Sequence, residues 1–321
     1  MNINIEDLAE YTDKQRNINL SCLGDELQSL PEDLSVNGSL NISSTGIENL
    51  PQGLYIKGDL ICRNASLSEI PEDIIIGGSL IIEYCSNIKT LPNGLEIGKN
   101  FQGSNSGLIS LPDELTIGGG FYIANTDVEK IPEKLYVEKD INIASTKIEK
   151  LPCGLHVKGD LICISSCLSE IPEDIIIEGS LKIEFCFELK VLPEGLTIGK
   201  DLEGSSSGLL SLPEGLIVGK GLYVANTKIE NLPNKISVGQ DMHLYNTPIS
   251  HLPDNLLVNG NLCISRTKIR ELPKGLRINK SLIIYHTDIK QLPDDIFIEG
   301  VLYSKYSALE SIPEKYCRTI D

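Results

Sequence analysis

Eight side chains in the last third of the sequence have the chemistry best suited to recognising another molecule. Tyrosine offers a large contact area and a hydroxyl at low entropic cost, and it is enriched in recognition surfaces. The repeat pattern described below places these side chains on one exposed face of neighbouring strands, which lie about 4.8 Å apart. We therefore predict a protein-binding surface there, with stacking for stability alone as the alternative. The eight residues are Tyr223, His243, Tyr245, Arg266, Tyr285, His286, Tyr303 and Tyr306.

Other reactive residue types do not combine into a catalytic or cofactor site. The sequence contains no readable Ser-His-Asp, Cys-His or His-x-x-x-His arrangement. Glycine–lysine pairs such as Gly98-Lys99 lack the spacer, the following Ser or Thr and the helix of a phosphate loop. We therefore expect neither an enzyme nor a bound cofactor. The four histidines are dispersed rather than clustered: His156, His243, His251 and His286.

The nine cysteines suggest core residues in a reducing compartment. They are odd in number and include no C-x-x-C pair, so the pattern favours neither a disulfide framework nor a zinc site. Cys22, Cys62 and Cys163 share one inward repeat position, and Cys85 and Cys186 share another. We expect small apolar core residues and a cytoplasmic protein.

The net charge of −17 argues against direct nucleic-acid binding, which needs a basic surface to displace counterions. It also suggests an alternative role, in which an acidic surface blocks a bacterial or phage nucleic-acid-binding enzyme. A third option is a carbohydrate-binding solenoid or an enzyme. No apolar run of 18 or more residues is present, so we expect no membrane span. The first residues also lack the basic and apolar regions of a secretory signal.

A repeat of 20 residues must position these side chains. Fifteen of the 16 prolines follow Leu or Ile at this spacing, with two intervals of 21 residues. So short a fixed period predicts a solenoid in which each coil packs on its neighbours. The gridded prolines are 31, 51, 71, 92, 112, 132, 152, 172, 193, 213, 233, 253, 273, 293 and 313.

Each repeat divides into inward and outward positions, counted here from its proline as position 0. Positions 9 and 11 are apolar and alternate with polar residues, which predicts one strand per coil in a parallel sheet. Position 14 carries a small residue, usually Thr or Ser, in every coil, and we expect a buried hydroxyl ladder there. Glycines at position 6 or 7 are expected to allow a positive φ or a close approach. The inward positions of the second repeat are Leu54, Ile56, Leu60, Cys62, Ala65, Leu67 and Ile70.

This pattern resembles the leucine-rich repeat. Leu40, Ile42, Thr45 and Ile47, followed by Leu50-Pro51, are similar to the short Leu-Pro-containing repeats of bacterial effectors of the YopM and IpaH type. The resemblance covers residues 31–313, without the ligase domain of IpaH-like effectors. It implies a protein-binding scaffold that acts on host proteins after delivery by a non-classical secretion system.

The expected fold is an α/β repeat solenoid, mainly β, with about 15 coils of 20–21 residues and a parallel sheet on one face. Residues 1–16 form an N-terminal cap, with a short helix from Ile5 to Gln15 that places Ile5, Leu8 and Ala9 on one side. Residues 17–313 form the solenoid and 314–321 a tail. Tandem five-turn blocks near 51–151 and 152–252 indicate a duplication at an offset of 101 residues. The leading functional prediction is a non-catalytic scaffold for a protein partner.

Overall fold

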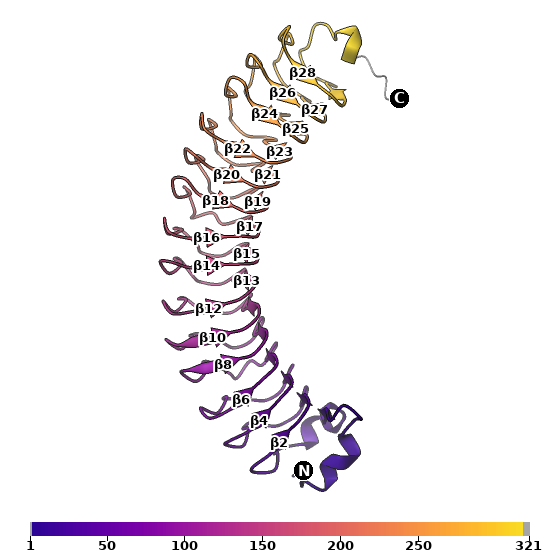
Figure 1. The fold of residues 1–321 in the computed structure, drawn as a ribbon, viewed down its shortest axis with the longest axis vertical. Coiled ribbons are helices and arrows are strands. Elements are labelled where there is room, and N and C mark those ends of the chain that lie inside the picture. The colour runs from indigo at the N-terminus through magenta and orange to yellow at the C-terminus, as the bar shows by residue number, and fades with distance from the viewer. Residues whose placement is uncertain (1, 317–321) are drawn as a thin grey trace. The chain divides into compact units, whose positions relative to one another are not determined.

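The computed structural model describes residues 2–316 and consists of coils that each carry two short strands. The chain divides into two compact units, residues 1–162 and 163–321. Within each unit, odd-numbered and even-numbered strands lie on opposite sides of the coils (Figure 1). Neighbouring strands pair in parallel, one coil to the next.

The first unit begins with the 3-10 helices η1 (Asp7–Tyr11) and η2 (Ser21–Glu26). Its odd-numbered strands are β1 (Ile18–Asn19), β3 (Leu40–Asn41), β5 (Leu60–Ile61), β7 (Leu80–Ile81), β9 (Phe101–Gln102), β11 (Phe121–Tyr122), β13 (Ile141–Asn142) and β15 (Leu161–Ile162). Its even-numbered strands are β2 (Ser35–Val36), β4 (Tyr55–Ile56), β6 (Ile75–Ile76), β8 (Leu95–Ile97), β10 (Leu115–Ile117), β12 (Tyr136–Val137) and β14 (His156–Val157).

The second unit repeats this arrangement and ends in the 3-10 helix η3 (Glu314–Tyr316). Its odd-numbered strands are β17 (Leu181–Lys182), β19 (Leu202–Glu203), β21 (Leu222–Tyr223), β23 (Met242–His243), β25 (Leu262–Cys263), β27 (Leu282–Ile283) and β29 (Leu302–Tyr303). Its even-numbered strands are β16 (Ile176–Ile177), β18 (Thr197–Ile198), β20 (Ile217–Val218), β22 (Ser237–Val238), β24 (Leu257–Val258), β26 (Arg277–Ile278) and β28 (Phe297–Ile298).

The core is a stack of aliphatic layers between the two strand sides. All seven inward positions predicted for the second repeat are buried, each at most 5% exposed. The same columns are buried in the following coils, so burial of aliphatic side chains supplies the main stabilising free energy. The prediction of a mainly β parallel solenoid is therefore confirmed.

The hydroxyl ladder at position 14 is also present. The Oγ1 of Thr146 donates to the carbonyl oxygen of Ile143 at 2.7 Å, and Thr247 makes the equivalent bond to Leu244 at 2.8 Å. Where a cysteine replaces the hydroxyl residue, Cys85 Sγ contacts the carbonyl oxygen of Cys62 at 2.8 Å. The bond satisfies a buried carbonyl where the strand ends and the loop begins.

The residue at position 13, directly before the ladder residue, has a left-handed backbone conformation in successive coils. Its φ lies between 53° and 62°, a region that costs free energy for residues other than Gly and is best tolerated by Asn and Asp. The sequence prediction did not identify this position. Its occupants are Ser44, Asn64, Tyr84, Asn105, Asn125, Ser145, Ser165, Phe185, Ser206, Asn226, Asn246, Arg266, His286 and Tyr306.

The glycines at positions 6 and 7 serve close packing between coils. A Cβ on Gly98 would lie 2.2 Å from the carbonyl oxygen of Gly77, and one on Gly219 would lie 2.1 Å from that of Gly199. Their φ values are not positive, so of the two reasons the sequence offered, close approach is the one that applies.

The N-terminal cap differs from its prediction. Helix η1 is shorter than expected and contacts β1. Leu8 is buried, but Ile5 is 61% exposed, and Ile3 fills the apolar role instead. In the first coil, Cys22 is exposed rather than inward, because the chain turns into η2 directly after β1.

Tyr316 in η3 covers the last coil of the second unit. Its ring is buried and its hydroxyl donates to the carbonyl oxygen of Ile296 at 2.9 Å. Across residues 2–316, the helices are all too short or too polar to cross a membrane.

Candidate protein-binding surface

The eight predicted residues lie along the exposed side of the odd-numbered strands in the second unit. We call these residues the aromatic face: Tyr223, His243, Tyr245, Arg266, Tyr285, His286, Tyr303 and Tyr306. They occupy positions 10, 12 and 13 of their coils, beside the strands that pair in the order β21, β23, β25, β27 and β29.

Tyr223 and His243 form the first group. They are register partners on β21 and β23, and their ring centroids are 5.1 Å apart. Burial raises the pKa of Tyr223, and the nearby carboxylates of Asp241, Asp201 and Glu203 raise it further. The phenol therefore stays protonated and remains able to donate a hydrogen bond.

Tyr245 and Arg266 form the second group. The Arg266 guanidinium carbon lies 5.7 Å from the centre of the Tyr245 ring, within range of a cation–π contact. Ser265, at the same outward position one coil after Tyr245, is only 1% exposed. Its hydroxyl accepts from the Tyr285 amide at 2.9 Å. Tyr245, Ser265 and Tyr285 are successive members of one column, which links this group to the next.

The third group covers the last two coils. Tyr285 and Tyr303 meet edge to face at 6.3 Å, and the rings of His286 and Tyr306 stack at 5.0 Å. The Lys305 ammonium lies 5.1 Å from the centre of the Tyr306 ring. Tyr306 remains 68% exposed, so a large apolar area is still available to a partner.

Three members of the aromatic face are held in the left-handed conformation. Arg266, His286 and Tyr306 have φ values of 56°, 53° and 61°. Most other coils place Asn or Ser here, and Asn tolerates the conformation best; Tyr84 and Phe185 are the other large residues at this position. A large side chain at this position costs backbone free energy but projects beyond the sheet. Strain of this kind is a physical reason to look for a binding role.

The structure brings residues between the predicted ones into the same surface. Cys263 and Ile283 lie in register between His243 and Tyr303. Lys305 joins through its contact with Tyr306. Cys263 and Ile283 belong to the position-10 column. Extending this predicted column through every coil would therefore have identified both residues.

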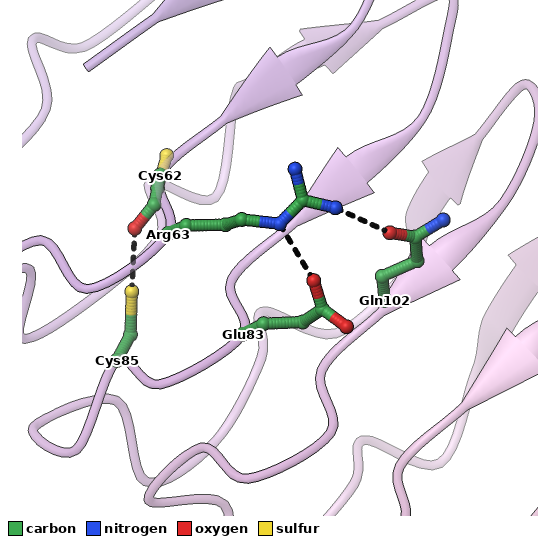
Figure 2. Close-up of polar contacts among 5 residues, drawn as sticks. All are labelled: Cys62, Arg63, Glu83, Cys85 and Gln102. Atoms are coloured by element: carbon green, nitrogen blue, oxygen red, sulfur yellow. Dashed lines mark hydrogen bonds and ion pairs between the residues drawn. The ribbon is translucent and has the colours of Figure 1, made fainter. Parts of the chain in front are cut away.

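The matching side of the first unit is occupied by polar pairs instead. Figure 2 shows Arg63 reaching over the next two coils, with Nε 2.7 Å from Glu83 and Nη2 3.2 Å from Gln102. Tyr122 donates to Asp140 at 3.1 Å, and burial with this charge raises its pKa to about 12. These groups already have partners within the chain and offer less to another molecule.

The outward aspartates at position 8 bind the backbone. Asp59 Oδ1 accepts from the Ser79 amide at 2.7 Å, and Asp241 Oδ1 accepts from the Asn261 amide at 2.6 Å. Asp140 and Asp201 make the same bond, to the backbone amides of Asp160 and Gly221. These aspartates therefore join successive coils.

The cysteines in the core are not activated nucleophiles. Burial raises the pKa of Cys62 and Cys163 well above its usual value and that of Cys85 to about 11. A nucleophilic thiol needs the opposite shift. In the part of the chain that the structure describes, no cluster of three or more His, Cys, Asp or Glu could hold a metal ion.

Comparison with known proteins gives structural neighbours only. No protein-family model and no curated protein matches the sequence. YopM from Yersinia enterocolitica WA-314 aligns over 96% of this chain and 92% of its own, with 18% identity and a TM-score of 0.39. The leucine-rich effector protein YopM from Yersinia pestis aligns over 97% of this chain and 89% of its own, with 19% identity and a TM-score of 0.47.

Proposed function

We propose that this chain is a non-catalytic scaffold that binds a protein partner through the aromatic face. The observation that supports this most strongly is the run of aromatic and cationic groups over successive coils, three of whose members occupy a strained backbone position. Aromatic and arginine side chains of this kind dominate the binding free energy of protein interfaces. No cofactor is part of the proposal.

The alternative of stacking for stability alone accounts for less of the geometry. Tyr223, Tyr245, Tyr285 and Tyr303 are half-buried against their neighbours, as that alternative requires. Tyr306 and His286, however, are exposed and lie in the left-handed conformation. A purely structural role would favour Asn at that position, as in Asn226 and Asn246 of the same unit.

Inhibition by an acidic surface is a weaker candidate, because many carboxylates already have partners. Asp73 and Asp295, which follow gridded prolines, accept the backbone amides of Gly53 and Gly275, each at 2.8 Å. Others pair with lysines one coil away, as Glu114 does with Lys134 at 2.9 Å. A mimic of a nucleic-acid backbone would need free charges in a regular double row. Competition by DNA for the captured partner would favour this alternative.

The resemblance of the Leu-Pro repeats to effector repeats adds a cellular setting to the proposal. In that setting the chain is delivered into a host cell and its partner is a host protein. The carbohydrate-binding alternative predicts retention on immobilised glycans that is lost when the tyrosines are changed.

Affinity capture tests the proposal. The chain and a Tyr245→Ser, Tyr285→Ser, Tyr303→Ser variant would be incubated with bacterial and eukaryotic lysates, and retained proteins identified by mass spectrometry. A matched control changes three tyrosines of the first unit: Tyr55→Ser, Tyr84→Ser and Tyr136→Ser.

We expect a partner that the control retains and the first variant loses, and its lysate of origin identifies a host or a bacterial target. Circular dichroism must show the same fold for all three proteins. A partner retained equally by both variants would contradict the proposed surface.

A further inference from the structure

Two neighbouring coils that carry part of the aromatic face reverse the charge of the chain. Between residues 261 and 290 the sequence has seven Lys or Arg residues and two acids, Glu271 and Asp288. The whole chain has 28 basic and 45 acidic residues, so this segment is basic within an acidic protein. Arg266, Tyr285 and His286 of the aromatic face lie within this segment.

Three of these cations are exposed along one short stretch. Arg266, Lys268 and Arg270 are exposed, whereas Thr267 and Ile269 between them are buried. The three cations therefore reach solvent together, while the residues between them pack into the core.

The next coil repeats the alternation. His286, Asp288 and Lys290 are exposed, and the two residues between them are buried. Arg266, Lys268, Arg270 and Lys290 together form what we call the basic strip.

The strip borders a groove made of two overlapping hollows. One hollow of about 520 Å³ is lined by His251, Lys268 and Arg270, among others. A second of about 710 Å³ is lined by Arg270, Asp288 and Lys290, among others. The two hollows share Arg270, Glu271 and Asp288, so together they form one groove across successive coils, close in sequence to Arg266 and His286 of the aromatic face.

The positive charge of the strip is largely uncompensated. Arg270 and Asp288 are 3.9 Å apart with both side chains at least 76% exposed, which makes a weak ion pair. Within residues 2–316, neither Lys268 nor Lys290 has an ion-pair partner. Arg266 contacts only the face of the Tyr245 ring, which leaves its guanidinium edge available to a carboxylate.

We propose that the groove and the basic strip bind an acidic, extended peptide segment of the protein partner. This inference rests on the proposed function and specifies the chemistry of the partner. Carboxylates of the peptide would lie against Lys268, Arg270 and Lys290, and its apolar side chains against Tyr306 and His286. A polynucleotide is disfavoured, because Glu271 and Asp288 lie within the groove and the rest of the chain is strongly acidic.

The test uses an array of random-sequence dodecapeptides and a labelled twelve-nucleotide single-stranded DNA as probes. The basic-strip variant carries Lys268→Gln, Arg270→Gln and Lys290→Gln. A matched control carries Lys274→Gln, Arg277→Gln and Lys280→Gln, exposed residues at positions 1, 4 and 7 of one of these coils. Both variants change the net charge equally. A difference in peptide affinity between them is therefore due to the groove and not to the overall electrostatic field of the protein.

We expect the peptides bound by the unchanged chain to be enriched in Asp and Glu. Their affinity should fall about tenfold in the basic-strip variant, remain within about twofold in the control, and weaken as salt is added. Enrichment of neutral or basic peptides, equal loss in both variants, no selective binding, or tighter binding of the DNA would each overturn the inference.

Capture of the partner separates this inference from the proposed function. A partner lost by the tyrosine variant but retained by the basic-strip variant would support the scaffold and overturn the acidic-peptide inference. A partner retained by the tyrosine variant would overturn the proposed function itself.

Discussion

Each ladder hydroxyl closes a short turn at the end of a strand, where the backbone leaves the sheet. The bond joins the side chain of position 14 to the carbonyl three residues earlier, as in Thr146 and Thr126. The carbonyl is buried and must be satisfied, so a small residue with a donor is favoured at that point. This explains why the serines and threonines of the ladder are structural despite their regular spacing.

Replacing Thr146 by Val should lower the free energy of unfolding by about 1 kcal/mol, because the Ile143 carbonyl loses its hydroxyl donor. Urea unfolding followed by circular dichroism measures the change. The exposed Thr116→Val serves as the control and should change stability little. Equal stability of the two variants would refute the structural role of the hydroxyl.

Glu184 is a residue whose charge opposes folding. Its Oε2 is buried and makes no hydrogen bond within the described residues. Burial raises the pKa of the carboxyl, and the nearby Glu203 carboxylate raises it further. A raised folded pKa means that folding favours the protonated form. The contribution of this group to stability is fully present below the ordinary pKa and is lost as pH rises through the raised value.

We therefore expect Glu184→Gln to stabilise the protein at neutral pH by less than about 1 kcal/mol, since the residue is only half-buried. The gain should shrink as pH falls through the raised pKa and vanish below the ordinary pKa of 4.5, where the carboxyl is neutral in both states. Thermal unfolding at pH 7 and pH 4 measures the difference. A gain that does not depend on pH would contradict the assignment.

At the scale of the strand, side chains at position 8 join each coil to the next. Asp241 accepts the backbone amide of Asn261, and Asn261 in turn accepts that of Ser281 at 3.1 Å. Asp and Asn both serve, because each has an oxygen at the required distance. The column therefore needs an acceptor rather than a charge.

Asp241→Ala should lower the free energy of unfolding by about 1–3 kcal/mol, because the Asn261 amide loses its acceptor. Asp241→Asn should recover most of this loss, since Oδ1 is kept. Chemical unfolding of both variants, with the exposed Asp254→Ala as control, measures the effect. If Asn were as damaging as Ala, the negative charge itself would be the stabilising feature.

The strands and the inward columns could be predicted from the sequence, because a fixed period and an apolar alternation repeat in each coil. The ladder followed from the same repetition.

The left-handed position was missed, although Asn64, Asn105 and Asn125 at that point are a recognisable signal. Contacts between coils were also missed. The bond from Arg63 to Gln102 spans 39 residues, and only the stacking register brings the two together.

The stack as a whole depends on contacts between neighbouring coils. In such an array, stability is approximately a sum of coil and interface contributions, and the ends need covering. Ile3 and Leu8 cover the start of the first unit, and Tyr316 covers the end of the second. The ends are therefore where local opening should begin.

Tyr316→Ala should increase amide exchange in the last coils, near β29, and leave β21 unchanged. The substitution removes a buried ring and its bond to the Ile296 carbonyl. Hydrogen exchange read by mass spectrometry resolves the two regions. Tyr316→Phe, which keeps the ring, should have a smaller effect. Faster exchange throughout the second unit would show that the stack unfolds as one body.

The left-handed position and the strand face lie outside the aliphatic layers, so substitutions at these exposed positions leave the core unchanged. Asn142 and Ala144 in the first predicted block correspond to His243 and Tyr245 in the second, at the offset of 101 residues, while Ile143 and Leu244 between them stay fully buried. The two blocks thus differ in their exposed contacts while the buried residue between these positions stays aliphatic in both. Repeated coils therefore allow the exposed positions to change by single substitutions, while the buried columns that hold the coils together are kept.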